Sequence, residues 1–242
     1  MDTTLDRIGL YDLFGTFLSG AIISQLFCYL TTIFLSSEAS RAIFQTELSS
    51  LSLNALSAVT FSFLVGLVLE SCASLMDKKF FRFRDKAMDL IDSAPDKVLS
   101  VDISSANLDA MKQSILGNTF PQSDPEAKRK GEYIYQQCKI YLEANKLNAR
   151  EQSINAIYVL TRNVMVGFGF CMVLYLAIQF LNYRFTASLH PAPAFSLAVI
   201  VLFGFCIAVL WNRCTSYSRY RVRVILREYY HHKFAAEASS SH

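Results

Sequence analysis

Four long stretches of this sequence contain no Asp, Glu, Lys or Arg, and they constrain the fold more than any other feature. They cover residues 13–35, 48–69, 163–183 and 185–212. A helix needs about 20 apolar residues to cross the roughly 30 Å hydrocarbon layer of a bilayer. The sequence therefore predicts an all-α integral membrane protein, built as a four-helix membrane bundle with a helical cytoplasmic base.

The distribution of basic residues predicts the orientation of these spans. Of the 23 Lys and Arg residues, only Arg41 and Arg184 lie in the two short loops that would be external, and the other 21 lie elsewhere. Basic residues are retained on the cytoplasmic side. Both termini and the central segment are therefore expected inside the cell.

The expected organisation has four parts. Spans 1 and 2 occupy residues 1–76, a cytoplasmic helical region occupies 77–157, spans 3 and 4 occupy 158–212, and a basic helical tail occupies 213–242. A soluble region of this size forms only a marginal core, so we expect it to pack on cytoplasmic extensions of the membrane helices or on neighbouring subunits.

Several local signals mark the helix boundaries. Asp124 and Pro125 predict the start of a helix that runs to about residue 145. Asn148 with Glu151 resembles a capping box, which predicts a helix from 149 to about 182. We expect span 4 to continue to about Lys233, and span 2 to continue as a helix through 91.

Spans 1 and 2 carry small or polar residues at every fourth position, and residues at this spacing share one helix face. Such faces either pack closely against other helices or line a water-filled path in an oligomer. The candidate pore-lining residues are Ser24, Thr31, Asn54, Ser62 and Glu70.

Three polar side chains within the apolar runs need partners. Gln25 and Asn54 require a hydrogen-bonding group or water inside the bilayer. Glu70, near the expected cytoplasmic end of span 2, is the only acidic residue inside an apolar run, and an intramembrane carboxylate is a functional candidate. It would either pair with Arg162 or form a ring at the inner mouth of a cation pathway.

Basic and aromatic residues alternate in the C-terminal tail, where Arg219, Tyr220, Arg221 and Arg223 are candidate ligand-binding residues. Arginine binds phosphate through two hydrogen bonds, and tyrosine rings stack on bases. A second candidate patch consists of Lys128, Arg129 and Lys130. The alternative for the tail is that it anchors the protein on the cytoplasmic side and contacts anionic lipid.

No enzyme signature is present in the sequence. It contains no GxSxG, HExxH or P-loop motif, and its six cysteines include no CxxC pair. We therefore expect no catalytic residues, no metal and no cofactor. A lipid- or solute-handling membrane enzyme is the least favoured hypothesis, because no nucleophile with a neighbouring base is visible near the spans.

The N-terminal motif resembles that of a known family. The sequence YDLFG at 11–15, followed by Ser19 and Gly20, is similar to the YDxxGxxxPG opening of a family of bacterial four-span proteins, with Ser19 in place of the usual Pro. The resemblance continues at the end of span 2, at the entry to span 3 and in the tail. Its residues are Gly66, Glu70, Ala149, Arg150, Tyr158, Thr161, Arg162, Arg219, Tyr220 and Tyr229.

Members of this kind resemble the membrane effectors of anti-phage defence systems, above all the Hailong-type effectors. The resemblance implies a homo-oligomeric ion channel, expected as a tetramer, in the bacterial inner membrane. It also implies a nucleotide or short DNA oligomer as ligand and a nucleotidyltransferase as functional partner. The alternative function is a non-conducting membrane scaffold that recruits a cytoplasmic protein.

Overall fold

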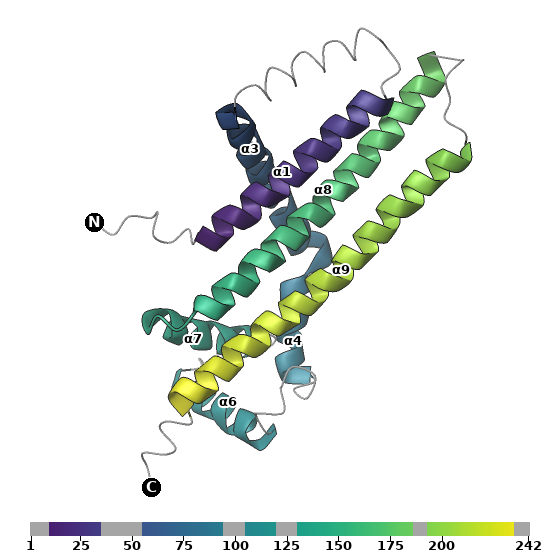
Figure 1. Ribbon diagram of the computed structural model, residues 1–242. Coiled ribbons are helices and arrows are strands. Elements are labelled where there is room, and N and C mark those ends of the chain that lie inside the picture. The colour runs from purple at the N-terminus through teal and green to yellow at the C-terminus, as the bar shows by residue number, and fades with distance from the viewer. Residues whose placement is uncertain (1–9, 35–54, 94–104, 120–129, 186–192, 235–242) are drawn as a thin grey trace. The chain divides into compact units, whose positions relative to one another are not determined.

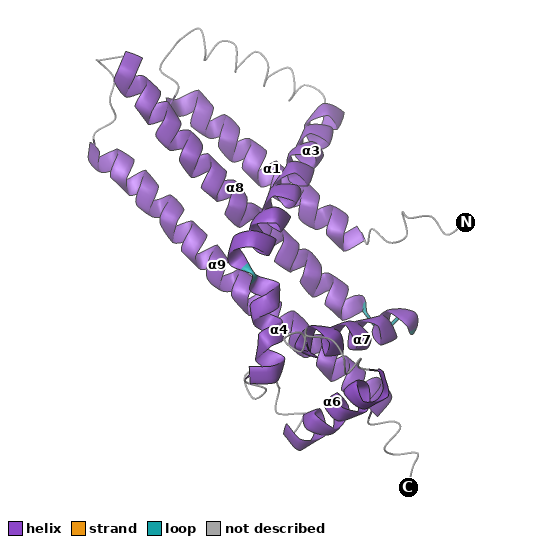
Figure 2. Ribbon diagram, turned by 180° about the vertical axis from the view of Figure 1, so that it is seen from behind, coloured by secondary structure: helices purple, strands orange, loops and turns teal. Residues whose placement is uncertain are grey.

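The computed structural model describes residues 10–34, 55–93, 105–119, 130–185 and 193–234, and every secondary-structure element in these ranges is helical (Figures 1 and 2). The all-α prediction is therefore confirmed for this part of the chain. The helices are α1 (Leu10–Phe34), α3 (Ala55–Met76), α4 (Phe83–Ser93), α6 (Ser105–Thr119), α7 (Lys130–Ala144), α8 (Ala149–Phe185) and α9 (Pro193–Tyr229). Two single π-helical turns follow α3 and α9, at Asp77–Phe81 and Tyr230–Phe234.

The chain divides into two compact units. The apolar unit consists of Met1–Met76 and Ala156–Cys214, and the charged unit consists of Asp77–Asn155 and Thr215–His242. Helices α8 and α9 each contribute residues to both units.

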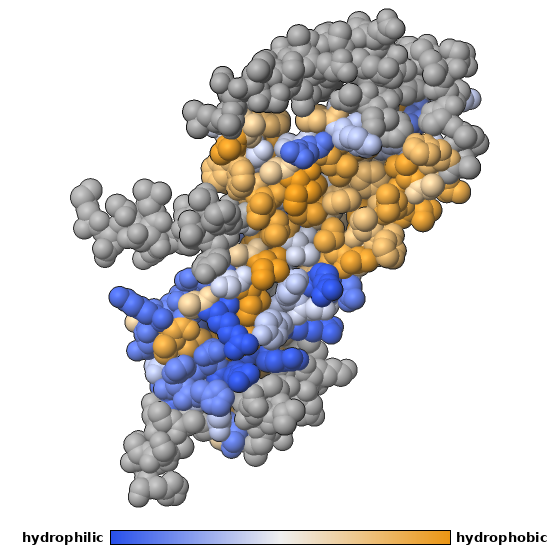
Figure 3. Space-filling view, viewed as in Figure 1, coloured by the Kyte–Doolittle hydropathy of each residue, from blue (hydrophilic) through white to orange (hydrophobic). Residues whose placement is uncertain are grey.

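Three helices are long and apolar enough to cross a membrane. They are Ala58–Phe81, Ala149–Leu181 and Phe195–Lys233, and Gly15–Thr31 within α1 is a shorter apolar helix. Figure 3 shows hydrophobic side chains gathered on the surface of the apolar unit and hydrophilic side chains on that of the charged unit. Soluble proteins rarely expose such a continuous apolar surface to water. The length and composition of these helices therefore support the prediction of a transmembrane protein.

Glycines allow α1 and α3 to pack closely in the apolar unit. A Cβ atom at Gly20 would overlap the Ser62 carbonyl oxygen and lie 2.6 Å from the Gly66 backbone nitrogen. A Cβ at Gly66 would in turn overlap the carbonyl oxygen of Thr16. The small-residue faces predicted from the sequence therefore pack against one another here, as membrane helices commonly do.

A second contact in the apolar unit joins α1 to α8. A Cβ at Gly15 would lie 3.1 Å from the Ala156 carbonyl oxygen, and one at Gly167 would overlap the Ile23 side chain. Helix α9 packs on α8 through Phe203, whose ring centroid lies 5.7 Å from that of Phe168. The buried core of this unit consists of Ile23, Leu30, Leu69, Cys171, Tyr175 and Phe203.

The charged unit has a core of its own, built on α4, α6 and α7 and completed by the end of α9. Its buried members include Ile91, Met111, Ile134, Cys138 and Ile225. Helix α7 turns Ile134, Cys138 and Leu142 inward, because residues three and four apart share a face. The charged unit therefore packs on the final part of α9, whose earlier part is apolar.

The continuous helix predicted from span 2 through residue 91 is wrong. Arg82 has a φ of 49°, in the left-handed region, and separates the π turn from α4. The Phe83 amide donates to Asp77 Oδ1 at 3.0 Å, and the Arg82 amide donates to the Asp77 carbonyl at 2.7 Å. Asp77 therefore caps the first turn of α4. The two hydrogen bonds that Asp77 accepts take the place of the backbone bonds that would continue a regular α-helix through Arg82.

The other helix predictions are confirmed where the structure describes them. Helix α8 begins at Ala149, directly after Asn148, and continues to Phe185. Helix α9 continues without a break into the tail, and its final π turn reaches Phe234. The predicted start of α7 at Asp124 lies outside the described residues.

Candidate functional site

A carboxylate and a hydroxyl meet where α1 packs on α3. Thr16 Oγ1 donates to Glu70 Oε2 at 2.7 Å, and Thr16 is buried while Glu70 is half-buried. The contact lies one turn from the Gly20–Gly66 approach, so the close packing brings these side chains within reach. The sequence suggested Arg162 as a partner for Glu70. The structure places the Arg162 guanidinium 5.5 Å from the centroid of the Tyr158 ring.

The remaining pore candidates lie mostly inside the subunit. Ser24 and Thr31 are buried, and their hydroxyls donate to the carbonyls of Ala21 and Cys28 on the same helix. Ser62 is half-buried against α1, and Asn54 lies outside the described residues. Ser24, Thr31, Ser62 and Glu70 therefore do not form an exposed polar stripe in a single copy of the chain.

Asn163 of α8 is a buried polar residue that the sequence analysis did not select. Its side chain is fully buried, and among the described residues neither Oδ1 nor Nδ2 has a hydrogen-bond partner. It lies between Leu160 and Gly167, both of which are approached by α1. A buried side-chain amide without a hydrogen-bond partner is rare in proteins and lowers the stability of the fold.

The first turn of α8 is joined to the end of α9 by a buried ion pair. Arg221 Nε and a terminal nitrogen both lie 2.5 Å from Glu151 Oε1. The Glu151 side chain is 5% exposed and that of Arg221 is 17% exposed. Glu151, expected to complete a capping box with Asn148, thus binds a residue 70 positions away. The positive charge of Arg221, a candidate phosphate contact, is neutralised by this carboxylate.

A second, more exposed set of contacts joins the same two helices. Arg150 donates to the Tyr220 hydroxyl at 2.9 Å, and its other terminal nitrogen lies 3.7 Å from Glu228 Oε1. The Tyr220 hydroxyl, together with Glu228, raises the pKa of Arg150. Each helix thus supplies one acid and one base to the other, which fixes their register in the charged unit.

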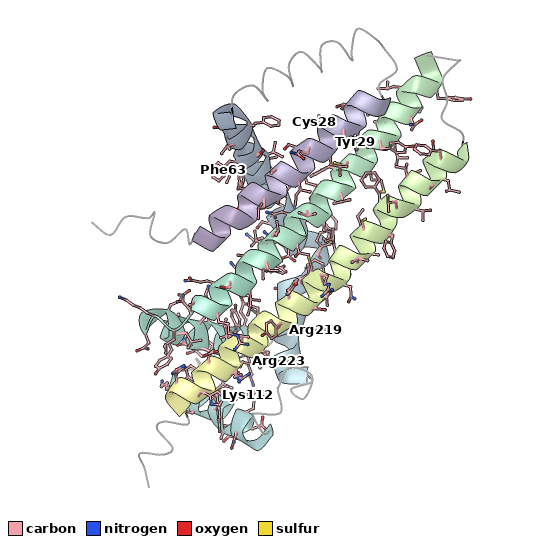
Figure 4. All side chains as sticks on the ribbon, viewed as in Figure 1. Cys28, Tyr29, Phe63, Lys112, Arg219 and Arg223 are labelled. Carbon is pink, nitrogen blue, oxygen red and sulfur yellow. The ribbon has the colours of Figure 1, made fainter. Side chains whose placement is uncertain are left out.

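Two of the arginines predicted to bind ligand lie one turn apart on α9. Figure 4 shows Arg219 and Arg223 on this helix, where Arg219 is exposed and Arg223 is half-buried. Lys130 is exposed at the start of α7, whereas Lys128 and Arg129 lie outside the described residues. Of the candidate ligand-binding cations that the structure describes, Arg219 and Lys130 are therefore the exposed ones.

Two of these features could not be selected from sequence. Glu151 was noticed only for its local spacing from Asn148, and nothing local indicates a partner on α9. Asn163 follows Arg162 at the end of an apolar run, where an amide is unremarkable. Within the described ranges, no three His, Cys, Asp or Glu side chains come together as metal ligands would.

Comparison with known protein families, curated proteins and solved structures gives no match to this chain.

Proposed function

We propose that this protein is a homo-oligomeric ion channel of the bacterial inner membrane, with four spans and both termini in the cytoplasm. Helix α1, which has 25 residues, is the fourth span beside the three long apolar helices. The orientation follows from the concentration of Lys and Arg outside the two short loops. A tetramer is the expected assembly, from the family resemblance.

The observation that carries this proposal is the continuity of α8 and α9. Each is a single helix of 37 residues, about 55 Å long at 1.5 Å per residue. Each contains one segment that belongs to the apolar unit and one that belongs to the charged unit. Because no flexible linker interrupts either helix, displacement of the charged segments is transmitted to the apolar ones. This is the mechanical requirement of a gated pore.

The ligand in this proposal is a nucleotide or short DNA oligomer. Arg219 and Lys130 supply exposed positive charge, Arg223 lies one turn from Arg219, and the Tyr220 ring is available for stacking. For the ligand to gate the pore, it must bind one state more tightly than the other. Opening hydrates the polar contact between Thr16 and Glu70.

The biological role follows from the resemblance to Hailong-type effectors. Such a channel, controlled by the product of a neighbouring nucleotidyltransferase, dissipates the membrane potential of an infected cell and stops its growth.

Membrane depolarisation in cells tests the channel directly. The protein is expressed alone and with its neighbouring nucleotidyltransferase, and a potential-sensitive dye is read in both strains. We expect depolarisation that the nucleotidyltransferase switches on or off. Arg219→Gln should abolish this control, whereas the exposed residue Lys86 on α4 provides the matched control variant Lys86→Gln. An unchanged potential in both strains, with the protein shown to be inserted, refutes the channel and favours the scaffold.

A further inference from the structure

One face of α1 is uncovered within the subunit. Leu18 is 42%, Ile22 46% and Tyr29 64% exposed, and Gln25 is also exposed. At about 100° per residue these four side chains lie within about 60° of one another around the helix. We call them the Gln25 face.

Two other sides of α1 contact neighbouring helices. Gly15 and Ile23 contact α8, while Thr16 and Gly20 contact α3. None of these four positions belongs to the Gln25 face. The carboxamide of Gln25 therefore points away from both helices that α1 packs on.

Gln25 also lies next to the midpoint of the charge-free run at residues 13–35. Ten or more residues separate it from either end of the run, which is about 15 Å along a helix, so its amide lies too deep to reach the headgroup region. Hydrocarbon provides no hydrogen-bonding group, and a primary amide exposed to it is strongly unfavourable. Because no helix that the structure describes covers this face, we look for the partner in another molecule.

We infer that the Gln25 face is the surface on which a second copy of this chain docks, with the Gln25 carboxamides of neighbouring copies hydrogen-bonded to each other. A primary amide carries both donor and acceptor, so it is self-complementary in a symmetric assembly. Polar side chains on membrane helices commonly join copies in this way. The inference rests on the homo-oligomeric part of the proposed function and is independent of conduction.

The apolar unit offers a matched position that should remain in lipid. Val173 of α8 is at the centre of the run at 163–183 and is 61% exposed. It has the same expected depth as Gln25 and no polar group. Single cysteines at these two positions therefore differ mainly in their location, one on the Gln25 face of α1 and the other on an exposed position of α8.

Oxidative cross-linking in native membranes tests the surface. Gln25→Cys and Val173→Cys are each combined with Cys28→Ala, which removes the nearby native thiol, and the Cys28→Ala protein alone gives the background. We expect a disulfide-linked dimer from Gln25→Cys only. A dimer from Val173→Cys without one from Gln25→Cys overturns the inference and leaves the homo-oligomer standing. A monomer in all three proteins, also after amine cross-linking, overturns both.

Substitutions that remove or keep the Gln25 amide give a second test, which does not depend on the orientation of a cysteine at residue 25. Gln25→Leu should reduce the oligomer fraction after amine cross-linking by about three- to tenfold, the effect of losing one interhelical hydrogen bond. Gln25→Asn, which keeps an amide, and Val173→Leu should each leave this fraction unchanged. An oligomer fraction for Gln25→Leu equal to that of the parent overturns the inference.

Discussion

Replacing Glu151 by alanine removes the carboxylate that neutralises Arg221 inside the charged unit. Loss of one partner from a buried ion pair destabilises a protein by about 3–5 kcal/mol, because the other charge stays in a poorly solvated place. The Arg221 side chain is 17% exposed and retains some hydration, so we expect the lower end, about 3 kcal/mol. Alanine is the best helix former, so the first turn of α8 is not otherwise weakened.

Hydrogen exchange of the backbone amides at the end of α9 measures this loss. Because a tenfold change in an equilibrium corresponds to about 1.4 kcal/mol, exchange at residues 222–229 should accelerate about 100-fold in Glu151→Ala. Arg150→Ala is the matched control on the adjacent residue. Arg150 is half-exposed and 3.7 Å from Glu228, and exposed pairs contribute at most about 1 kcal/mol. The control should therefore accelerate exchange fivefold or less.

A double variant separates charge from packing. Glu151→Leu with Arg221→Met replaces both charges by apolar side chains of similar size, which is often neutral for a buried pair. Exchange at the end of α9 should then return most of the way to that of the parent protein. The reasoning is refuted if the double variant exchanges as fast as Glu151→Ala, or if Arg150→Ala has the same effect as Glu151→Ala.

Three further changes test the packing. Gly66→Ala places a Cβ against the Thr16 carbonyl and should destabilise the protein by about 1–3 kcal/mol, whereas Gly204→Ala, which meets open space, should be neutral; equal melting temperatures in detergent would contradict this. Asn163→Leu removes an unsatisfied amide and should leave the melting temperature unchanged or higher; a clear fall would mean that the amide binds a group such as water. Burial raises the pKa of Cys138 to about 12, although Lys233 opposes this shift, so alkylation of the native protein at pH 8 should be about 100-fold slower than after denaturation. Peptide mapping measures alkylation of Cys138 in the native and in the denatured protein, and equal rates would contradict this prediction.

Local sequence signals predicted much of the helical architecture. Charge-free runs and the spacing of Asn148 from Glu151 depend only on neighbouring residues. The helices that they predicted are present in the structure because backbone hydrogen bonds within a helix are also local. The inward positions of α7 follow from the same kind of signal, since its apolar residues recur at helical spacing.

The break at Arg82 shows where such signals fail. Residues 76–91 contain neither Gly nor Pro, so propensity favours an unbroken helix. The Asp77 side chain and carbonyl instead bind the amides of Phe83 and Arg82. An aspartate competes with the backbone in this way wherever the tertiary structure favours a turn, and the sequence alone does not say where that is.

The arginines of α9 illustrate the same point for the candidate site. From sequence they form one basic cluster, but at about 100° per residue Arg221 lies about 160° away from Arg219 around the helix, while Arg223 lies within about 40° of it. Arg219 is exposed, whereas Arg221 is half-buried and binds Glu151. A variant that reverses several arginines together would disrupt the fold of the charged unit as well as any ligand contact. Arg219 is the position where a loss of ligand control can be read without a loss of stability.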